Sequence, residues 1–108
     1  MKDQSLGEFE EMVLLMVAAL HDEAYGVVLQ ESLEEELKRK VNISAIHVAL
    51  KRMERKEFVK SRFGGITADR GGRRKKFYVI TALGKRMLDS QYALRTELYK
   101  QIPKISFS

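Results

Sequence analysis

Side chains able to bind nucleic acid are concentrated between Asn42 and Ile80, beginning with a predicted helix. Ser44 is its expected N-cap, and three apolar residues at i, i+4 and i+7 form one stripe: Ile46, Leu50 and Met53. At about 100° per residue, the other side carries mainly polar and basic residues. These are Ser44, His47, Val48, Lys51, Arg52 and Arg55. Such side chains contact base edges and phosphates, so we expect a recognition helix.

Two β-like segments follow this helix, residues 58–63 and 76–80. The connecting residues 64–75 contain four glycines and a basic run at their exit: Arg73, Arg74 and Lys75. A helix beside a basic β-hairpin is typical of a winged helix-turn-helix, in which we expect these cations to contact the DNA backbone or the minor groove. Residues 41–43 alternate and are β-branched at both ends, so we expect a third strand there.

The net charge of +5 is unevenly distributed along the 108 residues. Residues 1–37 hold ten carboxylates and one cation, whereas residues 38–76 hold fourteen cations and three carboxylates. One part of the chain therefore repels phosphates and another attracts them, which favours double-stranded DNA as the partner over a uniformly basic surface.

Composition excludes several classes of protein. Without cysteine the chain has no disulfide framework, thiolate zinc site or cysteine nucleophile, and two histidines make no metal set, so we expect no cofactor. No Ser/His/Asp spacing, phosphate loop or paired carboxylates predict catalysis, so we expect no enzyme. The longest apolar run, residues 12–20, is too short to span a membrane, and no signal-peptide pattern is present; we expect a soluble cytoplasmic protein.

The first predicted helix begins with a capping box, Ser5 and Glu8, and runs to about Leu20. Its predicted core stripe is Phe9, Met12, Val13, Met16 and Leu20, with Leu14, Leu15 and Val17 lying off it. A helix that is apolar nearly all round needs cover on both sides. The second side indicates a partner chain, or alternatively a helix central to its own domain.

A second helix is predicted from Leu29, Leu33 and Leu37, and a fourth from a Thr81 cap to about residue 101, before Pro103. The fourth carries two apolar stripes: Leu83, Met87, Leu94 and Leu98, and then Leu88, Tyr92 and Tyr99. Two stripes need two neighbours, so we expect a homodimer through helices one and four. The predicted fold is mainly α with a small antiparallel β-hairpin wing: a winged helix-turn-helix domain over residues 1–80, then a C-terminal dimerisation helix and tail over residues 81–108.

Four segments resemble the PadR family of transcriptional regulators: LGEFE (6–10), AYG (24–26), IHVALKRME (46–54) and GGRRKKFYVITALG (71–84). The resemblance implies a homodimeric, ligand- or stress-responsive repressor that binds palindromic operator DNA. It is closest to the short subfamily, in which helices one and four form the dimer and enclose a hydrophobic effector pocket. Four residues could line such a pocket or simply form interface core: Met12, Met16, Leu88 and Tyr92.

Two residues depart from the family pattern. His47 stands where Tyr is common, and Glu57 stands where Gly follows the recognition helix, which costs about 1 kcal/mol in a left-handed stop unless the stop is built another way. We expect Lys51 and His47 to read base edges, with Arg52 as an alternative, and Ser44 with the first-turn amides to hold phosphates. Tyr25 either binds a phosphate through its hydroxyl or packs in the core.

The predicted function is a sequence-specific DNA-binding transcriptional regulator. The alternative is an effector- or protein-binding module in which the winged helix serves only as a scaffold.

Overall fold

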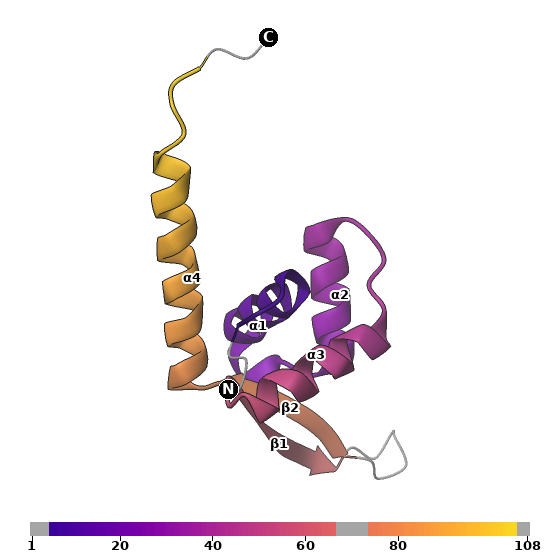
Figure 1. Ribbon diagram of the computed structural model, residues 1–108. Helices are drawn as coiled ribbons and strands as arrows, with labels where there is room; N and C mark the ends of the chain where they lie inside the picture. The colour runs from indigo at the N-terminus through magenta and orange to yellow at the C-terminus, as the bar shows by residue number, and fades with distance from the viewer. Residues whose placement is uncertain (1–4, 67–73, 106–108) are drawn as a thin grey trace.

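The computed structural model describes residues 5–66 and 74–105. The elements are α1 (Glu8–Leu20), the short 3-10 helix η1 (His21–Glu23), α2 (Gly26–Leu37), α3 (Ile43–Arg55), β1 (Val59–Ile66), β2 (Arg74–Ile80) and α4 (Ala82–Lys100). The first three α-helices pack together above the hairpin, and α4 rises along one side of this body toward the C-terminus (Figure 1). Four α-helices and an antiparallel pair of strands give the predicted winged helix with a C-terminal helix.

The core is built from all three helices of the body and both strands, with Leu29, Ile46, Leu50 and Phe58 fully buried at its centre. The sequence prediction for α2 and α3 is confirmed, because the leucine stripe of α2 and the Ile46, Leu50 and Met53 stripe of α3 face this core. With its apolar stripe covered, α3 turns its polar side outward.

The predicted core stripe of α1 is correct at Val13, but it misses two fully buried residues, Leu14 and Val17. Val13, Leu14 and Val17 are fully buried, whereas Phe9, Met12, Met16 and Leu20 lie half-buried at the margin of the core. The buried face was difficult to recognise because it also contains Glu10, which is only 9% exposed. Since α1 contacts α2, α3, β2 and α4, it needs apolar residues on more than one stripe, and helical spacing alone does not rank the stripes.

The two buried carboxylates of α1 connect it to different helices. Glu10 lies 3.2 Å from Nζ of Lys56, at the end of α3, and 3.9 Å from Nη1 of Arg52. Glu11 accepts a hydrogen bond of 2.9 Å from Nη2 of Arg95 on α4. A carboxylate removed from water is costly unless it is paired, so these contacts hold α3 and α4 against adjacent residues of α1.

Two predicted helix starts and the third strand are wrong. Gly7 is the N-cap of α1 in place of Ser5, and Asn42 caps α3 in place of Ser44, with Oδ1 accepting hydrogen bonds from the amides of Ser44 (2.7 Å) and Ala45 (3.4 Å). Residue Val41 forms no strand because side chains of α2 bind its backbone. Its amide donates to Glu34 and its carbonyl accepts from Gln30, each at 2.9 Å.

The hairpin strands are longer than predicted and pair from Val59 opposite Ile80 to Ile66 opposite Arg74. Residues 41–43 were expected to form a third strand at the edge of the hairpin sheet. The segment before α2 pairs with β2 instead. Tyr78 donates its amide to the carbonyl of Ala24 at 2.8 Å, and Tyr25 forms an isolated bridge with Phe77. The start of α2 is thereby fixed beside the wing.

A compact joint connects the end of α3 to the start of α4. Glu57 adopts the left-handed conformation (φ 67°), and the amides of Glu57 and Phe58 donate to the carbonyls of Glu54 and Met53, which forms a Schellman stop without glycine. Thr81 then donates its hydroxyl to the carbonyl of Glu57 at 2.7 Å and its amide to that of Phe58 at 3.0 Å. As predicted, its hydroxyl also caps α4, accepting from Gly84 at 3.0 Å.

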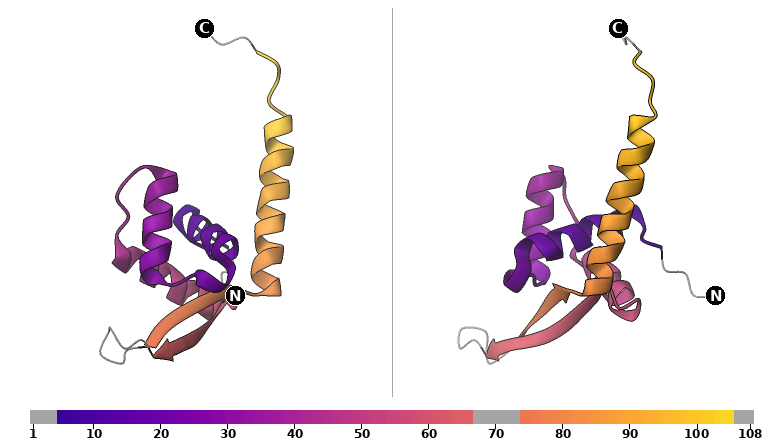
Figure 2. Two further views of the ribbon diagram at one scale, coloured as in Figure 1. Left: turned by 180° about the vertical axis from the view of Figure 1, so that it is seen from behind. Right: turned by 90° about the vertical axis from the view of Figure 1, so that its left-hand side faces the viewer.

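Most of α4 extends beyond the body. Leu88 is buried and Met87 half-buried near its start, but four large side chains further along are 55–75% exposed: Tyr92, Leu94, Leu98 and Tyr99. Both views in Figure 2 show α4 standing to one side of the body, with its C-terminal end rising beyond the other helices. Within one chain, neither predicted stripe of this helix is fully covered.

Candidate nucleic-acid interface

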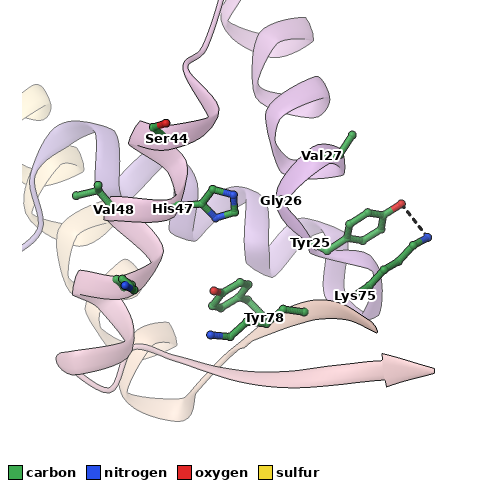
Figure 3. A pocket seen from close by; sticks show the side chains of 10 residues that line it. Tyr25, Gly26, Val27, Ser44, His47, Val48, Lys75 and Tyr78 are labelled. Atoms are coloured by element: carbon green, nitrogen blue, oxygen red, sulfur yellow. Dashed lines mark hydrogen bonds between the residues drawn. The ribbon is translucent and has the colours of Figure 1, made fainter. Parts of the chain in front are cut away.

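A groove of about 710 Å³ lies between the start of α2, the outer face of α3 and β2. Figure 3 shows its side chains converging from these elements. It is lined by Tyr25, Gly26, Val27, Ser44, His47, Val48, Lys51, Lys75, Lys76 and Tyr78. Its lining residues include three lysines, one histidine and three that carry a hydroxyl, Ser44, Tyr25 and Tyr78. These side chains give the groove the donors and positive charge that suit a polyanion.

Six of the nine residues predicted to bind DNA line this groove: Tyr25, Ser44, His47, Val48, Lys51 and Lys75. They come from three elements, and local sequence alone does not show that these elements meet. Their convergence depends on α3 burying its apolar stripe and on the pairing of Tyr25 with β2.

The remaining three predicted residues lie elsewhere or are only partly described. Arg52 lies on the flank of α3 that faces the start of α1, where its side chain is 62% exposed and pairs with Glu10. Arg73 lies outside the described residues. Arg74 opens β2, and only its backbone is described.

Tyr25 lies between the groove and the wing. Its hydroxyl accepts a hydrogen bond from Nζ of Lys75 at 3.4 Å, and the same ammonium lies 4.7 Å from the ring centroid. On its other side the ring meets Phe77 edge to face, with centroids 5.2 Å apart, and Arg62 lies 4.9 Å from the centroid of Phe77. Tyr25 therefore packs on the hairpin, and its hydroxyl lies at the groove; its contact with a phosphate stays a prediction.

Four groove residues were missed from the sequence: Gly26, Val27, Lys76 and Tyr78. Gly26 was recognisable only as a break before α2, but a Cβ there would lie 3.1 Å from Cε1 of His47. Glycine thus allows the imidazole to lie close to the start of α2. Lys76 was predictable from the basic run that it continues.

The starts of two helices also face this region. α2 has no acidic residue in its first turn, and Tyr25 caps it without a side-chain hydrogen bond, so its partial positive charge is not offset there. At α3 the amides of Ser44 and Ala45 are already bound by Asn42, which leaves the exposed hydroxyl of Ser44 as the group that faces the groove.

The residues predicted to line an effector pocket do not share one environment. Leu88 is buried, Met12 and Met16 are packed at the margin of the core, and Tyr92 is 74% exposed.

No group of three or more His, Asp or Glu side chains among the described residues could hold a metal ion. No helix in the described part of the chain is long and apolar enough to cross a membrane.

Comparison with known proteins identifies the family. The model of the PadR-like family of transcriptional regulators matches residues 14–90, from the middle of α1 to the first half of α4. The chain belongs to this family. PadR-like proteins are transcriptional regulators that act through DNA binding and are not enzymes.

Solved structures, two of them described as PadR proteins, have the same fold. A PadR-like transcription factor from Bacteroides fragilis is 22% identical, with 85% of this chain and 84% of that one covered and a TM-score of 0.71. A PadR family regulator from Clostridium difficile R20291 is 26% identical, with 85% and 92% covered and a TM-score of 0.68. A structure described as the complex structure of hsRosR-S4 is 20% identical, with 94% and 78% covered and a TM-score of 0.68. Among curated proteins, no relative matches.

Proposed function

We propose that this PadR-like chain is a sequence-specific DNA-binding regulator that acts as a homodimer on a palindromic operator. The observation that carries the proposal is the groove, where six residues of DNA-binding type converge from α2, α3 and β2. Their charges and donors match a duplex, which presents phosphates along its edges and hydrogen-bonding groups in its major groove.

In this proposal α3 enters the major groove. Lys51 and His47 contact base edges, and Ser44 contacts a phosphate. Tyr25 and Lys75 lie where the wing meets α2, so they contact the sugar-phosphate backbone beside the entry of α3. Arg73 and Arg74 extend this contact along the backbone or into the minor groove.

The exposed apolar length of α4 supports a dimer. Large side chains on the second half of this helix are left open to solvent, and Leu15 on the neighbouring α1 is 44% exposed. Large exposed apolar side chains of this kind mark a protein contact, and pairing through a two-fold axis covers the same surface on both copies. Two recognition helices then reach half-sites about 10 base pairs apart, or a multiple of one helical turn.

Regulation by a ligand is the last part of the proposal. A hydrophobic effector would bind where α1 and α4 of the two copies meet, beside Met12, Met16, Leu88 and Tyr92. Binding there changes the angle between the two recognition helices and releases the operator, which makes the protein a ligand-responsive repressor.

Selection of bound duplexes from a random pool, with the purified protein, tests the proposal. We expect an enriched palindrome and an affinity for it that falls steeply with salt. Retention of a hydrophobic protein or compound without any salt-sensitive duplex binding would instead favour the scaffold alternative. Repeating the assay with flat hydrophobic compounds tests whether a ligand releases the operator.

A further inference from the structure

Val48 is an unusual residue for its position on α3. It is 49% exposed and lies one turn after Ser44 and one turn before Lys51 on the outer side of the helix. At about 100° per residue, Val48 lies roughly 40° from Ser44 and roughly 60° from Lys51 on the helical wheel. A β-branched apolar side chain therefore lies at the centre of a face otherwise made of polar and cationic groups.

Val48 also lies where α3 projects from the body. It borders the groove on one side and, on the other, a shallow hollow toward the start of α1 that includes Phe9, Ala45 and Arg52. A side chain that borders two hollows stands on the ridge between them, so it is among the first parts of α3 to meet a surface that fits the groove. Figure 3 shows Val48 on the opposite side of His47 from the start of α2.

The surroundings of Val48 indicate what it contacts. An apolar protein surface would bring Lys51, His47 and the lysines of the wing out of water without partners, which is costly. A DNA major groove offers anions and acceptors to these groups and, at each thymine, one exposed C5-methyl group. Valine is well suited to this methyl because branching at Cβ fixes its rotamer.

We propose that Val48 determines specificity by packing against the C5-methyl group of a thymine. The inference rests on the proposed function, because it needs α3 in the major groove. Lys51 lies three residues further on, or about 4.5 Å along the helix axis. The thymine and the base read by Lys51 should therefore lie close together in the same half-site.

Replacement of single thymines by deoxyuridine in the selected operator tests this contact, because only the methyl group is removed. We expect one thymine in each half-site at which the replacement weakens binding about fourfold, the affinity equivalent of one buried methyl-sized group. The variant Val48→Ala should bind the thymine and deoxyuridine duplexes equally well. Alanine is a good helix former, so this exposed substitution preserves α3.

Val27→Ala is the matched control, because Val27 lines the same groove, is 44% exposed and lies on α2. It should keep the full response to deoxyuridine at that thymine. Loss of the response in Val27→Ala with its retention in Val48→Ala would overturn the assignment to Val48. An operator that is enriched and bound but insensitive to deoxyuridine at every thymine would overturn this inference alone, whereas absence of any enriched, salt-sensitive duplex would overturn the proposed function.

Discussion

The groove and the outer half of α4 differ in how far their side chains are packed by residues of the same chain. In the groove, polar side chains from three elements line one surface, Lys75 contacts Tyr25, and the apolar residues beneath α3 are buried. On α4, Tyr92 and Tyr99 are 74% and 75% exposed and have no cover from their own chain's core. The proposed nucleic-acid surface is thus assembled within a single chain, whereas the apolar side chains on the outer half of α4 stay exposed unless a second copy covers them, as the proposed dimer would do.

The largest effect is expected from a charge on α4. Leu94→Glu places a carboxylate on the exposed apolar stripe, so the dimer should dissociate and affinity for the palindrome should fall by about a hundredfold or more, because the second half-site no longer binds as part of the same molecule. Sedimentation equilibrium measures the dissociation, and fluorescence anisotropy measures the affinity.

Ala93→Glu is the matched control for this change. Ala93 is also exposed, but it lies on the polar side of α4, about 100° from Leu94. It should leave both mass and affinity unchanged. A dimer that persists in Leu94→Glu, or an equal loss of dimer and operator affinity in Ala93→Glu, would contradict the role of the exposed apolar stripe of α4 in dimerisation.

Lys51→Ala removes a base-reading group from the groove and leaves α4 untouched. It should cost about 1 to 3 kcal/mol on the selected operator and relax the base preference at one position of each half-site, with the dimer intact. Competition binding against operators changed at single positions measures this. Lys85→Ala, which removes an exposed lysine from α4, should retain the parental preference; an unchanged operator affinity in Lys51→Ala would rule out its role.

Lys75→Ala distinguishes contacts with the DNA backbone from contacts with bases. Because Lys75 is assigned to the backbone, its loss should weaken all duplexes alike and reduce the slope of log affinity against log salt by about one per subunit. Tyr25→Phe removes the hydroxyl that Lys75 contacts but keeps the ring beneath the ammonium, so its slope should stay close to the parental value. A sequence-dependent loss in Lys75→Ala would place this lysine among the base-reading residues.

Asn42→Ala tests the N-cap that stabilises the start of α3, and it should have the smallest effect on DNA binding. Two amides at the start of α3 lose their acceptor, so the free energy of unfolding should fall by about 1 kcal/mol. Urea denaturation measures this loss. Ser44→Ala, at the residue first expected to be the cap, should change stability by less, and the opposite order would show that the helix starts two residues later.

Much of the fold was predictable because its signals are local and agree with one another. The apolar stripe of α3, the alternation of the hairpin and the Thr81 cap each specify an element without reference to the rest of the chain. The six groove residues were recognisable for the same reason: their side-chain types suit DNA, and they flank elements of clear pattern.

The errors occurred where distant residues decide. Residues 41–43 have the composition of a strand, but Gln30 and Glu34 bind the backbone of Val41 and Asn42 turns its side chain to the helix start. In α1, the buried Glu10 made the core face look polar, because its partners Arg52 and Lys56 lie more than forty residues away. Neither arrangement leaves a periodic signal in the sequence.

The hydrogen bonds of Thr81 to Glu57 and Phe58 also connect α3, the proposed recognition helix, to α4, the proposed dimerisation helix. In a dimer on a palindrome, the distance between the two recognition helices must match the distance between the two half-sites. The end of the recognition helix is one side of this joint, and the root of the helix assigned to pairing is the other; Gly84 has no room for a Cβ there, which would lie 2.3 Å from the carbonyl oxygen of Phe58. In the proposed dimer, this joint would hold the recognition helix at a fixed angle to the two-fold axis. Substitutions at this joint would then change the spacing of the operator half-sites that the dimer binds, while every residue that contacts a base stays the same.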